Sequence, residues 1–149
     1  VFSWYDSGSD KGIELMGQSN RLVLRVNGQR AVSAGGRDGY YVNGRWTYFA
    51  VTFDGAKDKP VVKFYRGRPQ GEGDYEVNLV NTVTLEEALS DGVGPAKTWF
   101  SLANEPGRRR AFAGRMDNLA FWSDRGNADG VLSAEQLEAY RKLSLGLTP

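Results

Sequence analysis

The sequence predicts an all-β fold: an antiparallel two-sheet sandwich, of sandwich or jelly-roll type, with one short helix near its C-terminal end. Aromatic and β-branched residues, which favour strands, alternate with polar residues at period 2 in several short runs. Clusters of Gly, Pro, Asn and Asp separate the runs, and 19 of the 149 residues are glycine. This spacing is typical of an all-β domain, and the length fits one domain.

The clearest strand begins at residue 21, where Leu22, Leu24 and Val26 alternate with polar residues. The Asn27-Gly28 pair that follows is typical of a tight hairpin turn. The same pattern predicts strands over residues 2–5, 13–16, 46–53, 61–65, 77–85, 100–102 and 111–122.

The C-terminal helix is predicted by its start signal. Ser133 and Gln136 have the spacing of a capping box, and Leu132 and Leu137 have that of a hydrophobic staple. Apolar residues then recur at helical spacing and are expected to pack on the sandwich. They are Leu137, Tyr140 and Leu143.

Charge and composition exclude several classes of function. The formal net charge is +1, which argues against nucleic acid as a partner. The chain has no cysteine and no histidine, so disulfides, thiolate metal sites and imidazole-based catalysis are excluded. No stretch approaches the ~20 apolar residues of a membrane span. This composition suits a binding module, which needs neither a nucleophile nor a base.

Three strand segments and the helix follow one another in an informative order: RWTYFAVTFDG (45–55), VVKFYRG (61–67), FAGRMDNLAFW (112–122) and LSAEQL (132–137). Together they resemble laminin-G-like jelly rolls of the concanavalin A-like lectin and glucanase superfamily, over about half of the chain. The resemblance implies a jelly-roll sandwich over residues 1–149 that lacks its N-terminal strands and belongs to a larger protein. An exposed sheet edge would then be open to another protein chain.

The resemblance also implies a function. Glycosidases of the superfamily need two carboxylates on one strand face, and the sequence has no Glu-x-Asp-x-Glu run, so no enzyme is expected. The expectation is a non-catalytic, lectin-like module of a secreted or cell-surface protein that binds a glycan or polysaccharide. The alternative is a protein–protein adhesion or spacer module without a glycan ligand.

Two loops carry the chemistry of a sugar site. Planar hydrogen-bonding groups and aromatic rings suit the polar edges and apolar faces of sugars. In the loop 36–44 the candidates are Arg37, Asp38, Tyr40, Tyr41 and Asn43, and in the loop 104–110 they are Asn104, Arg108, Arg109 and Arg110. The arginines favour acidic glycans. The alternatives are that one of the adjacent tyrosines is a core residue and that the arginines serve solubility.

A structural Ca²⁺ is implied by the resemblance alone, with Asp117 at the matching position of the family's Gly-x-Ile-Asp element. Trp46 and Trp122 lie in matched strands and are expected in the core or at its edge. Trp99 precedes Phe100 and is expected to face outward.

Overall fold

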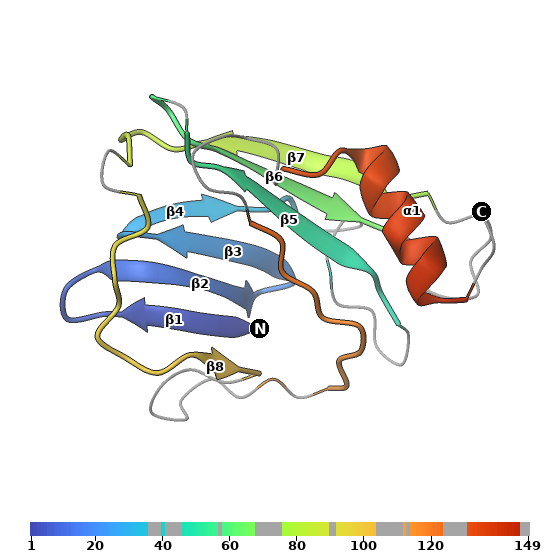
Figure 1. The fold of residues 1–149 in the computed structure, drawn as a ribbon, viewed down its shortest axis with the longest axis horizontal. Coiled ribbons are helices and arrows are strands. Elements are labelled where there is room, and N and C mark those ends of the chain that lie inside the picture. The colour runs from blue at the N-terminus through green and yellow to red at the C-terminus, as the bar shows by residue number, and fades with distance from the viewer. Residues whose placement is uncertain are drawn as a thin grey trace.

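The computed structural model describes residues 1–35, 40, 46–56, 58–67, 76–89, 92–103, 112, 114–123 and 131–146. In this part the chain forms two antiparallel sheets and one helix (Figure 1). The first sheet has five strands, in the order β4 (Gln29–Val32), β3 (Arg21–Val26), β2 (Lys11–Gln18), β1 (Phe2–Asp6) and β8 (Ser101–Leu102). The second has three, in the order β5 (Phe49–Asp54), β6 (Val61–Arg66) and β7 (Asn78–Thr84).

The sheets share a hydrophobic core between them. Because strand side chains alternate between faces, every second residue of β3 and β6 points inward. The core comprises Leu15, Leu22, Leu24, Val26 and Ala31 of the first sheet, Val62 and Phe64 of the second, and Tyr40 and Leu85 from outside the strands. The all-β sandwich predicted from the sequence is therefore confirmed at the level of two packed antiparallel sheets.

Asn81 on β7 joins the two sheets. Its Oδ1 accepts a hydrogen bond from the amide of Ala34 at 3.0 Å, and its Nδ2 donates to the carbonyl of Val32 at 3.2 Å. One side chain thus satisfies two backbone groups at the end of the edge strand β4, where none of the described strands pairs with them.

Helix α1 (Ala134–Ser144) packs on the other face of the second sheet (Figure 1). Tyr65 on β6 is 4% exposed and forms a second core with Val77 and Leu137, so β6 is buried on both faces. The predicted capping box is present: Ser133 Oγ accepts from the amide of Gln136 at 3.3 Å, and Gln136 Oε1 accepts from the amide of Ser133 at 2.7 Å.

A buried ion pair fixes α1 to the sheet. Arg141 donates to both carboxylate oxygens of Glu138, at 2.8 and 2.6 Å, and Glu138 also accepts the amide of Val77 at 3.0 Å. Hydrogen bonds from Arg141, then its charge and the Val77 amide, lower the pKa of Glu138 below its usual value, although burial opposes them.

The lowered pKa of Glu138 predicts acid sensitivity. The stabilisation is complete above the ordinary glutamate pKa of about 4.3 and is lost as the pH falls through the lower pKa of the folded state. Urea unfolding between about pH 7 and pH 3 should show this loss, and Glu138→Gln should remove that part of the pH dependence. If the free energy of unfolding falls equally with pH in the unaltered chain and in Glu138→Gln, the prediction is wrong.

Four expectations differ from the structure. Strand β5 begins at Phe49, three residues later than predicted, and β4 was not predicted. The strand expected over residues 111–122 is not formed within its described part, residues 112 and 114–122. Asn118 has φ 52 there and its amide donates to Asp117 Oδ1, a local bond that competes with strand pairing. Leu143, expected against the sandwich, is 74% exposed because it follows the last buried turn of α1.

Candidate ligand-binding site

The outer face of the first sheet, opposite the core, carries three rows of side chains across β2, β3 and β4. The strand register sets the rows: Gln18 with Arg21; Met16 with Val23 and Val32; Glu14 with Arg25 and Arg30. An apolar row is therefore bordered by a polar row on one side and a charged row on the other.

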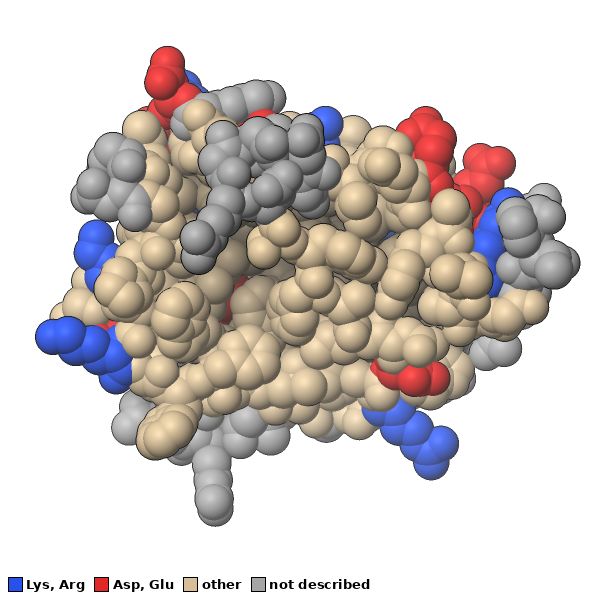
Figure 2. Space-filling view, in the orientation of Figure 1, with Lys and Arg blue, Asp and Glu red and all other residues tan. Residues whose placement is uncertain are grey.

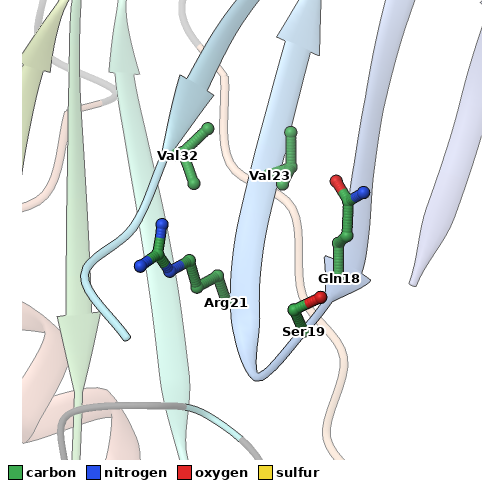
Figure 3. Close-up of a pocket in the computed structure, with 5 residues that line it drawn as sticks. All are labelled: Gln18, Ser19, Arg21, Val23 and Val32. Atoms are coloured by element: carbon green, nitrogen blue, oxygen red, sulfur yellow. The ribbon is translucent and has the colours of Figure 1, made fainter. Parts of the chain in front are cut away.

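A pocket of about 250 Å³ opens on this face, at the end of the β2–β3 hairpin (Figure 3). Its lining residues are Gln18, Ser19, Arg21, Val23 and Val32. Val23 lies at its base but is only 1% exposed, so the accessible apolar surface comes mainly from the half-buried Val32. Arg21 extends its guanidinium toward Val32, while Gln18 and Ser19 lie on the β2 side (Figure 3). The pocket combines apolar surface with polar groups, the usual chemistry of a small-molecule site.

The hairpin turn positions one wall of the pocket. Ser19 and Asn20 form a two-residue turn with φ 49 and 59, and two positive φ values match the twist of the flanking strands. This turn fixes the register in which Gln18 faces Arg21. Arg30 Nη2 then donates to Gln18 Oε1 at 3.1 Å. Because these two side chains lie on β4 and β2, the bond spans β3 beside Val23.

The Arg21 side chain lies against the backbone at Gly35. A Cβ built on Gly35 would lie 2.6 Å from Arg21 Nε and 3.1 Å from its Cγ, so the arginine stem occupies the space that a side chain would take. The preceding Ala34 is fixed by its hydrogen bond to Asn81. No carboxylate of the described residues forms a salt bridge with Arg21.

A satisfied polar network lies beside the pocket on the same face. Glu14, 6% exposed, pairs with Arg25 at 3.0 Å, and Ser3 donates to Glu14 at 3.4 Å. The Arg25 guanidinium lies 5.0 Å from the Tyr5 ring centre, and Tyr5 donates to Asp10 at 2.6 Å. Burial, followed by that hydrogen bond, raises the pKa of Tyr5 to about 12. These groups have partners and stiffen the sheet.

Most residues of the two predicted sugar loops lie outside the described part of the chain. They are Arg37, Asp38, Tyr41, Asn43, Asn104, Arg108, Arg109 and Arg110. Tyr40 is described and is a core residue, because it is 9% exposed and its ring lies 5.7 Å from that of Phe49. Burial raises the pKa of Tyr40 to about 12. Its ring therefore offers no open face for stacking.

The pocket residues themselves were missed by the sequence prediction. One signal was present: Val23 is an apolar residue at a polar position of the alternating strand 21–26. Its partners across the sheet depend on register, which one strand alone does not reveal.

A second exposed feature is an aromatic face on the core side of β1. The rings of Phe2, Phe100 and Phe121 contact one another with centroids 5.0–6.2 Å apart, and Phe100 and Phe121 are both more than half exposed. In Figure 2 much of the middle of the visible face is uncharged, with charged side chains mainly at its margins.

The tryptophans near this face differ in exposure. Trp99 is 87% exposed, as expected from its position before Phe100. Trp46 and Trp122 are each about half exposed, and Trp122 packs edge-on against Tyr140 of α1 at 4.6 Å. Trp122 is therefore an edge residue of the fold, as the sequence suggested.

Asp117 is exposed and accepts a hydrogen bond from the amide of Asn118 at 2.8 Å. Among the described residues, no three acidic side chains gather as a metal site, and no helix is long and apolar enough to cross a membrane. Comparisons with protein-family models, with curated proteins and with solved structures find no significant match for this chain.

Proposed function

We propose that this chain is a non-catalytic carbohydrate-binding module with a jelly-roll sandwich fold, part of a secreted or cell-surface protein, and that the pocket on the first sheet is its ligand site. The observation that carries the proposal is the mixed lining of that pocket. Val32 supplies apolar surface, while Gln18, Ser19 and Arg21 supply hydrogen-bonding groups around it.

A sugar ring has the matching chemistry. Its C–H groups form an apolar face, and its hydroxyls form a polar edge. The volume of about 250 Å³ falls just below the 300–1,000 Å³ that is usual for pockets enclosing a drug-sized ligand. The pocket therefore suits one sugar residue, with the rest of a glycan lying on the sheet outside it.

A glycan array followed by titration calorimetry tests this function. Val32→Phe is expected to weaken glycan binding at least about tenfold, because its ring fills the pocket from an edge strand that tolerates aromatic residues. Thr82→Phe puts the same ring on an exposed position of β7 and should bind as the unaltered chain does. Loss of binding in EDTA would support the Ca²⁺ expected at Asp117. The proposal would be overturned if the chain bound no neutral, uronic, sialylated or sulfated glycan on the array.

Contact with a protein partner is the second candidate, and the aromatic face favours it. The exposed rings of Phe100 and Phe121 pack with the half-buried Phe2, and exposed apolar clusters are typical of protein-binding surfaces. Phe100→Ser separates the two functions, because it alters this face and leaves the pocket unchanged. Glycan binding that is lost in Phe100→Ser and kept in Val32→Phe would move the ligand site to the aromatic face.

A further inference from the structure

We infer that the pocket selects an acidic sugar residue, with a carboxylate paired to the Arg21 guanidinium and the sugar ring against Val32. The inference deepens the proposed carbohydrate-binding function and rests on it. It depends on three features of the described residues: the charge of the sheet face, the position of Arg21 against Gly35 and the size of the pocket.

The sheet face has an excess of positive charge beside the pocket. Its strand positions carry Arg21, Arg25 and Arg30 but only one acid, Glu14. Arg25 is paired with that acid at 3.0 Å. Arg30 donates to the neutral amide of Gln18, so its positive charge is not neutralised by that contact. The face therefore attracts an anionic group, and the cation that lines the pocket is Arg21.

Arg21 lies where it can reach such a group. Its stem runs along the backbone at Gly35, where a Cβ would approach its Nε to 2.6 Å, and Asn81 anchors the neighbouring Ala34. A side chain at position 35 would therefore displace the guanidinium. A guanidinium forms two parallel hydrogen bonds with a carboxylate, and a carboxylate takes less room than a sulfate in a pocket of about 250 Å³.

The size of the pocket limits how the acid can be presented. In about 250 Å³ there is room for one ring, so the carboxylate and the ring face must belong to the same residue. In a uronic acid the carboxylate lies on the edge of the ring, and the C–H face stands at a right angle to that edge. The arrangement of an arginine beside the apolar Val32 fits these two groups together.

The test is titration calorimetry of the full chain with a uronate-containing disaccharide, its neutral counterpart and a sulfated one. We expect the uronate to bind about 10- to 100-fold more tightly than the neutral sugar. This is the gain in affinity expected from one hydrogen-bonded contact between charged groups. Arg21→Gln should abolish this preference, because the affinity for the uronate then falls to about that for the neutral sugar. Arg21→Lys should restore only part of it, because an ammonium cannot form the paired contact. Added salt should weaken uronate binding to the unaltered chain more than to Arg21→Gln.

Two further variants separate position from charge. Gly35→Ala keeps every charge but displaces Arg21, and it should reduce the uronate preference without lowering the melting temperature by more than a few degrees. Arg115→Gln removes an exposed arginine from the segment 114–123 and should change nothing.

Each outcome bears on a different statement. Equal binding of uronate and neutral sugars, an Arg21→Gln variant that keeps the preference, or tighter binding of the sulfated sugar would overturn the inference while the proposed function stands. Failure of all three sugars to bind, together with a silent glycan array, would remove the proposed function as well.

Discussion

Replacing Phe64 with alanine is expected to lower the free energy of unfolding by about 3–5 kcal/mol. Phe64 is 0% exposed and lies in the core between the sheets. Its strand, β6, is central in the second sheet and is covered by α1 on its other face, so the surrounding chain has little freedom to close over a cavity. Urea unfolding monitored by circular dichroism gives the change directly.

Two variants control for this result. Phe64→Leu keeps most of the apolar volume and should cost no more than about 1.5 kcal/mol. Phe100→Ala removes the same atoms from a ring that is 56% exposed, and it should cost well under half as much as Phe64→Ala. Equal losses at the two phenylalanines would show that the core between the sheets is not the main source of stability.

The sequence predicted the central strands and the helix because their signals are local. Residues 21–26 and 61–66 alternate over a full strand, and the Ser133–Gln136 capping box needs only four neighbouring residues. Asn27-Gly28 forms its hairpin turn with φ 44 and 85, as that pair predicts.

The missed elements depend on partners that a local pattern does not contain. Residues 29–32 read Gln-Arg-Ala-Val, too short and too polar to predict a strand, and they form β4 because β3 supplies hydrogen bonds along one side. Residues 114–123 resemble a strand but pair with none of the described strands, and the positive φ of Asn118 interrupts their alternation.

The candidate site could not be predicted from the sequence, because it too depends on residues that are distant in the chain. Gln18, Arg21 and Val32 come from three strands, and only the register set by the Ser19-Asn20 turn and the β3–β4 pairing brings them together. A shift of one residue would send every one of these side chains to the opposite face. The loops rich in arginine and tyrosine were the stronger local signal, and Tyr40 shows how such a signal can belong to the core.

Replacing Arg141 with alanine is expected to destabilise the fold by about 3–5 kcal/mol, because it leaves the carboxylate of Glu138 buried without its main partner. The Glu138 side chain is 15% exposed, and Lys142 is 3.9 Å away on the exposed side of the helix, too distant to replace two short hydrogen bonds. The Arg141 stem also packs near Gly67, so its loss opens space beneath α1.

A double-mutant cycle separates the ion pair from this packing. Arg141→Met keeps most of the stem and removes the charge, and Glu138→Gln removes the opposite charge. We expect each single variant to lose more than about 1.5 kcal/mol and the double variant to lose less than the sum of the two, because the interaction between Glu138 and Arg141 can be lost only once. Strict additivity, measured by urea unfolding near neutral pH, would assign the stabilisation to packing of the arginine stem and would leave α1 held by Leu137 and its apolar neighbours.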